Sequence, residues 1–129
     1  MKLTSKKTLI NKSQKALFAF LTDLRNFEQM MPDNVEDFTI DGDSFLFSLK
    51  GMPALRLVIK EQQAYDSIVL GAASNKLDFS LTTNISAGTE NSCEAQILFE
   101  GDFNPMMAMM VKKPLQQFID TLSEKAGTL

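Results

Sequence analysis

The spacing of apolar residues changes twice along the chain and so divides it into three parts. The first part is predicted to contain a strand and two short helices, the second a series of strands, and the third one long helix. Residues 2–10 are rich in Thr, Ser and Leu, which favours a first strand. Ser13 suits a helix N-cap, because its hydroxyl can accept a hydrogen bond from the first turn. An apolar stripe at helical spacing follows, made of Ala16, Leu17, Phe20, Leu21 and Leu24. Residues 27–31 predict a second short helix, which Pro32 ends.

Between Val35 and Phe99 the apolar residues alternate with polar ones, which predicts five or six antiparallel strands with one dry and one wet face. The expected turns are Asp41-Gly42-Asp43, residues 50–53, Tyr65-Asp66, Ser74-Asn75 and residues 87–91. Asn104-Pro105 suits the start of a long helix. Its apolar stripe consists of Met107, Val111, Leu115, Phe118 and Leu122. Pro114 lies within this stripe and is expected to kink or divide the helix.

A curved sheet with one apolar face and a single long helix to cover it predicts a space between the two. Apolar ligands are expected in that space, in contact with the inward side chains of the strands, the second short helix and the long helix. These expected ligand-binding residues are Phe27, Met31, Phe45, Phe47, Leu49, Leu55, Leu57, Ile59, Phe79, Leu81, Ile97, Phe99, Met107, Met110, Val111 and Leu115.

The order of elements resembles the helix-grip fold of the START-like, or SRPBCC, superfamily, which includes the birch-pollen-allergen-like proteins. Short motifs resemble a group of small bacterial members: Asn11-Lys12-Ser13 with Phe20-Leu21-Thr22-Asp23 and Phe27, Met31-Pro32 with Val35-Glu36, Lys50-Gly51-Met52, Asn104-Pro105-Met106 with Met109-Met110-Val111, and Lys113-Pro114-Leu115 with Phe118. The resemblance covers residues 1–129 as a single domain. It implies an α+β fold in which six or seven curved antiparallel strands wrap around a long C-terminal helix, with two short helices after the first strand. Members share a cavity and not a reaction.

The composition excludes several kinds of site. The 129 residues include one Cys and no His, so a Ser-His-Asp triad, a Cys-His pair, a disulfide and His-ligated zinc are all excluded. The net charge of -3 disfavours nucleic-acid binding. Asp41 and Asp43 fit a hairpin turn better than a calcium loop, and neither a metal nor a cofactor is expected. Without a signal-peptide pattern or a long apolar run, the expected location is the cytoplasm, with no membrane span.

Few polar side chains are expected on the dry face. They are Ser5, Thr83 and Cys93, with Lys7 and Glu61 near strand ends. The wet face is expected to carry Arg56, Lys60, Asp78, Glu94, Glu100 and Asp102. If the first and last strands pair, Lys2 and Lys6 can lie opposite Glu94 or Glu100.

Three functions remain open. The first is non-catalytic binding or transport of a small hydrophobic molecule, lipid-like or polyketide-like. The second is an enzyme of the polyketide cyclase or dehydratase type, which needs an inward acid or base, the candidates being Glu61, Lys7, Tyr65 and Arg56. The third is a protein-interaction module like the chaperone-activating branch of the superfamily, with a filled core and methionines facing a partner. Met107 and Met110 fit the inward stripe of the long helix, whereas Met106 and Met109 lie at its flank.

Overall fold

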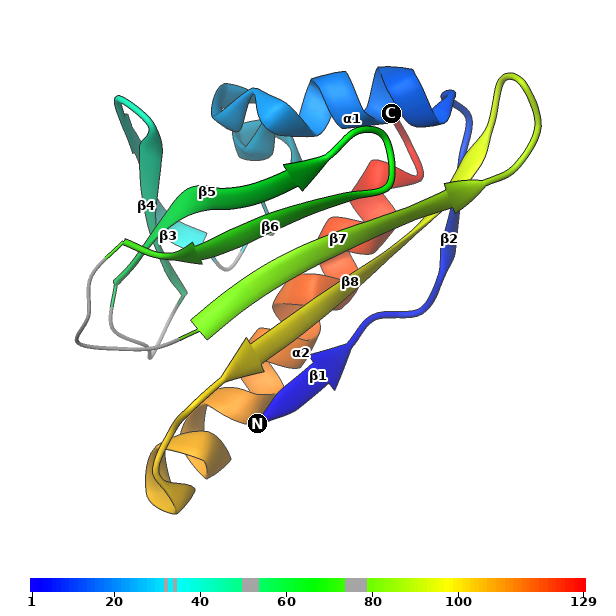
Figure 1. Cartoon of the computed structure of the whole chain (residues 1–129). Coiled ribbons are helices and arrows are strands. Elements are labelled where there is room, and N and C mark those ends of the chain that lie inside the picture. The colour runs from blue at the N-terminus through cyan, green and yellow to red at the C-terminus, as the bar shows by residue number, and fades with distance from the viewer. Residues whose placement is uncertain (32, 34, 50–53, 74–78) are drawn as a thin grey trace.

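The computed structural model describes residues 1–31, 33, 35–49, 54–73 and 79–129. Within them a curved antiparallel sheet surrounds a long C-terminal helix (Figure 1). The elements are β1 (Lys2–Thr4), β2 (Thr8–Ile10), α1 (Gln14–Thr22), the 3₁₀ helix η1 (Leu24–Met30), β3 (Val35–Asp41), β4 (Ser44–Leu49), β5 (Leu55–Gln63), β6 (Ser67–Ala72), β7 (Phe79–Ala87), β8 (Cys93–Gly101) and α2 (Pro105–Ala126). The predicted turns at 50–53 and 74–75 lie outside the described residues, as do Met52, Leu77 and Asp78.

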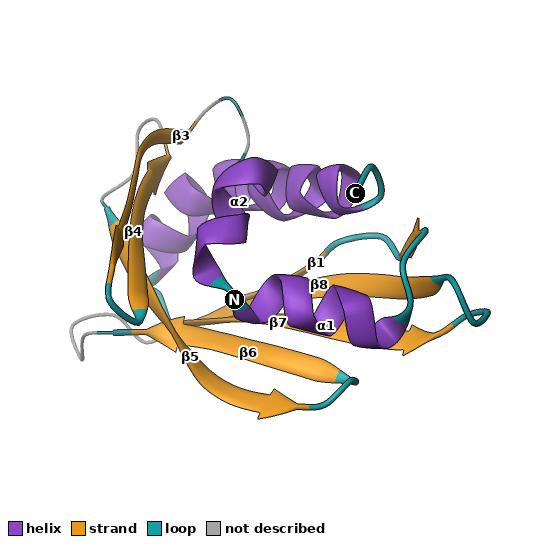
Figure 2. Cartoon of the chain, turned by 90° about the horizontal axis from the view of Figure 1, so that it is seen from above, coloured by secondary structure: helices purple, strands orange, loops and turns teal. Residues whose placement is uncertain are grey.

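The sheet has the order β1-β8-β7-β6-β5-β4-β3, and β2 also pairs with β8. The first and last strands are therefore neighbours, and with this pairing Lys2 lies opposite Glu100. In Figure 2 the sheet bends at β5, so that β3 and β4 stand almost upright relative to β7 and β8, with α2 in the corner between the two parts. The expected α+β architecture is confirmed.

The N-terminal segment differs from the expected single strand. It forms two short strands, so eight strands are present among the described residues where six or seven were expected. The Ser5 hydroxyl accepts a hydrogen bond from the Ile97 backbone N–H at 2.9 Å and donates to the Lys6 carbonyl at 3.0 Å. The buried Ser5 hydroxyl thus accepts a hydrogen bond that a backbone carbonyl would accept in a continuous strand, and the strand is interrupted there.

Local sequence signals account for the ends of the helices. The Ser13 hydroxyl accepts from Ala16 N–H at 3.1 Å, and the Asn104 side chain accepts from Met107 N–H at 2.8 Å, so both predicted N-caps are confirmed. The second short helix begins earlier than expected, at Leu24, because the Asp23 carboxylate caps it by accepting from Arg25 N–H. The long helix continues through Pro114 and is not divided.

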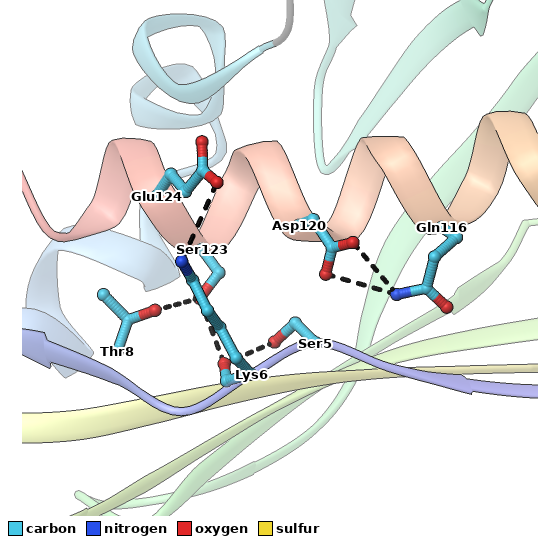
Figure 3. A network of polar contacts seen from close by, with 7 residues as sticks. All are labelled: Ser5, Lys6, Thr8, Gln116, Asp120, Ser123 and Glu124. Atoms are coloured by element: carbon cyan, nitrogen blue, oxygen red, sulfur yellow. Dashed lines mark hydrogen bonds and ion pairs between the residues drawn. The ribbon is translucent and has the colours of Figure 1, made fainter.

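Polar contacts attach the second half of α2 to β1, β2 and the segment between them (Figure 3). The buried Ser123 hydroxyl contacts the Thr8 hydroxyl and the Lys6 carbonyl. Gln116 donates to the Thr4 carbonyl at 3.0 Å. Lys6 pairs with Glu124 at 3.9 Å and not with a strand carboxylate, whereas Lys2 pairs with Glu100 at 3.8 Å. The second half of the helix is therefore fixed by both apolar and polar contacts.

Candidate functional site

Most of the expected ligand-binding residues lie together in one apolar core. Of the sixteen residues expected there, thirteen are buried in this cluster: Phe27, Met31, Phe45, Phe47, Leu49, Leu55, Leu57, Phe79, Leu81, Ile97, Phe99, Val111 and Leu115. Ile59 and Met107 are half-buried and pack against the cluster. The alternation of apolar residues in the strands and their helical spacing in α2 therefore predicted which side chains lie on the inner faces of the sheet and of the helix.

The concave face of the sheet and the second half of α2 are in direct contact. The rings of Phe47 on β4 and Phe118 on α2 stack with centroids 4.8 Å apart, and both side chains are almost completely buried. Phe45 extends the aromatic cluster by stacking on Phe27 of η1 at 5.3 Å. The rings of these four phenylalanines therefore fill the part of the expected space between the sheet and α2 in which they lie.

An open groove lies beside this core, between the α1–η1 junction, the β3–β4 turn and β5. Its volume is about 620 Å³. It is lined by Thr22, Asp23, Leu24, Arg25, Ile40, Gly42, Asp43, Val58, Ile59 and Gln62. Of the expected ligand-binding residues, Ile59 lines the groove directly. A β-bulge between Ile59 and Glu61 changes the register of β5 at this point.

The apolar part of the groove is continuous with the core. Ile40 is the cross-strand partner of Phe45, and Phe45 is the partner of Leu57 on the next strand, so these side chains share the inner face. Leu24 and Phe27 lie three residues apart in η1, and both are buried. The apolar lining of the groove therefore adjoins the Phe27–Phe45 stack.

Charged groups stand at the rim. Arg25 donates to both carboxylate oxygens of Asp23, at 3.0 and 2.9 Å. The hydrogen bonds from the Arg25 side chain and backbone lower the pKa of the Asp23 carboxyl, and Asp23 in turn raises the pKa of Arg25. The two charges neutralise each other, so Asp43 is the remaining charged group among the described lining residues. The groove combines an apolar floor with a polar rim, which is typical of sites for small molecules.

The candidate acids and bases lie away from the core. Glu61 and Lys7, which were expected near the dry face, are exposed, because the bulge in β5 and the interruption after β1 turn them to solvent. Tyr65 lies in the β5–β6 turn and is largely exposed, with its ring edge-on to Phe18 at 5.5 Å. Arg56 donates to the Ser44 hydroxyl at 2.8 Å and lies 3.8 Å from Asp41, on the outer side of the hairpin. None of the four stands where it could reach a ligand in the core.

The other polar residues expected inside behave as packing groups. Ser5 and Cys93 are buried, and Thr83 is half-buried. Burial raises the pKa of the Cys93 thiol, so it is held neutral. Within the described ranges, no group of three His, Cys, Asp or Glu side chains is placed to hold a metal ion.

The methionines of α2 divide between two surfaces, and Met110 differs from the expectation. It was expected to face inward, but its side chain is 65% exposed. Val111, its neighbour, is buried, and consecutive helical residues are separated by about 100° around the axis. Met106 and Met109 are also exposed, as their flanking positions indicated.

Sequence reasoning missed most of the groove. Thr22 and Asp23 were identified only within a motif of the resemblance, and Asp43 only within a hairpin turn. The polar break after α1 and the Asp-Gly-Asp turn are visible in the sequence. Their proximity depends on how the sheet bends, and no local pattern reports that bend.

Comparison with known proteins finds similar folds but no similar sequences. No protein-family model matches the chain. No curated protein matches it in sequence. Solved structures match it over nearly its whole length at low identity.

Three of these structures illustrate the likeness. A START superfamily protein from Mycobacterium smegmatis aligns with 98% of this chain and 94% of its own, at 10% identity and a TM-score of 0.67. A norcoclaurine synthase from Thalictrum, solved with a transition-state analogue, aligns over 98% and 94% at 11% identity and a TM-score of 0.68. The KanY protein aligns over 99% and 95% at 9% identity and a TM-score of 0.78. This chain therefore has the START-like helix-grip fold.

Proposed function

We propose that this protein binds a small hydrophobic molecule, lipid-like or polyketide-like, and that it does so without catalysis. The observation that carries the proposal is the groove of about 620 Å³, whose apolar floor continues into the aromatic core. The ligand would lie on Leu24, Ile40 and Ile59, with its polar end at the rim near Arg25, Asp43 and Gln62.

The buried residues behind the floor form the second part of the proposed site. Phe27 and Phe45 would contact the inner end of the ligand, with Leu57 beside them. The other core residues expected to contact ligand, on β7, β8 and α2, would be reached only by a ligand long enough to separate the sheet from the helix. The separation would occur at the first half of α2, which has fewer buried residues than the second half.

The positions of the titratable side chains support binding without catalysis. General acid–base catalysis needs such a group within hydrogen-bond reach of the substrate. Glu61, Lys7 and Tyr65 are exposed, and the Arg56 side chain is engaged at Asp41 and Ser44. Two carboxylates line the groove. Asp23 is held by Arg25 and has a lowered pKa, which makes it a poor proton donor, and Asp43 lies exposed in the β3–β4 turn at the rim.

Binding of the neutral fluorophore N-phenyl-1-naphthylamine, and its displacement by dodecanoic acid, tests the proposal. Ile59→Arg would place a charged side chain across the floor and is expected to reduce probe binding by at least about tenfold, because one apolar contact is lost and a charge is introduced. Val69→Arg is the matched control, since Val69 is a half-buried strand residue on the opposite face of the sheet.

The outcomes separate clearly. Probe binding by the wild type and by Val69→Arg, with loss in a folded Ile59→Arg variant, supports the proposal. A wild-type protein that neither binds the probe nor gains thermal stability from dodecanoic acid overturns it, because a ligand that binds the native state raises its stability.

A further inference from the structure

We infer that the N-terminal end of α2 is a docking site for the surface of an anionic lipid bilayer. The site consists of Met106, Met109 and Met110, followed by Lys112 and Lys113, and is called the methionine tip below. This inference does not depend on ligand binding in the groove, and the two can fail separately.

The methionine tip is exposed and lies at one extremity of the molecule. The side chains of Met106, Met109 and Met110 are 75%, 82% and 65% exposed. Three large apolar side chains exposed within one helical turn of each other are unusual on the surface of a monomeric protein. In Figure 1 the first turns of α2 lie beyond the ends of β1 and β8.

The helix runs past the sheet at this end. Ala108 lies on the same helical face as Leu115 and Leu122, which are fully buried, yet Ala108 is only half-buried. The end is nevertheless firmly attached at its base. Phe103, which precedes the N-cap Asn104, stacks on Phe99 of β8 at 6.2 Å and lies against Gly101, where an added Cβ would be 2.5 Å from the ring. The tip therefore projects from a fixed base.

The order of side chains along α2 favours a bilayer over a partner helix. A partner helix needs an apolar stripe along several turns. Here the exposed apolar residues end at Met110, and Lys112, Lys113 and Gln117 follow on the exposed surface. At 1.5 Å per residue, Lys112 lies about 9 Å from Met106 along the axis. If the tip points into the membrane, the methionines reach the acyl boundary, while the long side chains of the lysines keep their ammonium groups at the headgroups.

Most backbone N–H groups at the start of the tip are absent or already hydrogen-bonded, which lowers the cost of moving the tip out of water. Pro105 has no N–H, Met107 N–H donates to the Asn104 side chain, and Ala108 N–H donates to the Asn104 carbonyl at 2.9 Å. Three of the first four helical residues thus carry no free N–H. Lys112, Lys113 and the positive end of the helix dipole attract anionic headgroups, and exposed Asp102 opposes them.

Flotation with vesicles of phosphatidylcholine containing phosphatidylglycerol tests the inference at low salt. The wild type is expected to float with anionic vesicles and to be released as salt is raised. The triple variant Met106→Ser, Met109→Ser and Met110→Ser should lower the partition coefficient by more than about tenfold. Lys112→Gln with Lys113→Gln should lower it by about 30-fold, and Asp102→Asn should raise it by about fivefold.

Matched controls change the same residue types elsewhere. Leu9→Ser alters an exposed apolar residue of β2, and Lys15→Gln alters an exposed lysine of α1, and neither should change flotation. A gain in binding on Asp102→Asn with an unchanged urea midpoint reports the loss of a negative charge and not a loss of structure. Absence of flotation, flotation that survives the triple methionine variant, or a dimer that depends on the methionines without vesicle binding would each overturn the inference.

Discussion

Phe47 on β4 and Phe118 on α2 stack almost parallel, with ring centroids 4.8 Å apart and an angle of 10° between the planes. The two residues are far apart in the sequence and come from the two elements that define the helix-grip fold. Their contact closes the space between sheet and helix at this point. The groove of about 620 Å³ lies elsewhere, against the α1–η1 junction and the β3–β4 turn.

Removing this contact should destabilise the fold strongly. Phe118→Ala deletes a ring that is 1% exposed and leaves a cavity between the sheet and α2. We expect the free energy of unfolding to fall by about 3–5 kcal/mol. Urea denaturation followed by circular dichroism measures the change. Met109→Ala on the exposed surface of the same helix should stay within about 0.5 kcal/mol of the wild type.

The fold could be predicted because its signals are local. Gly42 has φ of 60° in the β3–β4 turn, a conformation that glycine adopts readily, and the Asp-Gly-Asp sequence indicated this hairpin. Ser13 and Asn104 mark the helix starts for an equally local reason, because each side chain bonds to a backbone N–H three residues later. The interruption at Ser5 was missed because it depends on Ile97, which lies on the last strand.

The site could be predicted less well, because alternation of apolar residues identifies the inner face without showing whether that face is filled or hollow. Phe45 and Ile59 both follow the period of two, yet Phe45 is fully buried and Ile59 lines the groove. The difference arises from the bend of the sheet and the bulge in β5. Met110 illustrates the corresponding limit of helical spacing. The spacing predicts the inward stripe of α2, but it does not show how far the helix extends past the sheet.

The contact between Thr8 and Ser123 should contribute measurably to stability. Ser123→Ala removes the partner of the Thr8 hydroxyl, whereas the Lys6 carbonyl still accepts from Ser5. We expect a loss of about 1 kcal/mol in the free energy of unfolding. Adding Thr8→Val should cost less than the sum of the single changes, because both remove one shared hydrogen bond. Strict additivity of the two changes would contradict a direct contact.

The pair of Asp23 and Arg25 predicts a pH dependence at the groove rim. The folded-state pKa of Asp23 is below its ordinary value, so the pair stabilises the folded state above about pH 3.9. That contribution is lost as the pH falls through the lowered folded value. The Asp23 carboxyl signal in NMR titrations should move to a higher midpoint in Arg25→Gln. An unchanged midpoint would contradict the pairing, and Lys2→Gln, at the Glu100 ion pair on the β1 edge of the sheet, is the control.

Cys93 provides a probe of opening at the edge of the sheet where β2 and β8 pair. Its side chain is fully buried and its pKa is raised by burial, so the thiolate that reacts with disulfide reagents is scarce in the folded state. At pH 8 we expect labelling by 5,5′-dithiobis(2-nitrobenzoic acid) to be at least about 100-fold slower in the native protein than in urea. Because the unfolded thiol ionises at an ordinary pKa of about 8.5 while the folded thiol stays neutral, the free energy of unfolding should fall as the pH rises above that value. Cys93→Ala removes this alkaline decline, and Ser123→Ala should keep it. Fast native labelling, with a decline in stability that persists in Cys93→Ala, would show that the thiol is not enclosed.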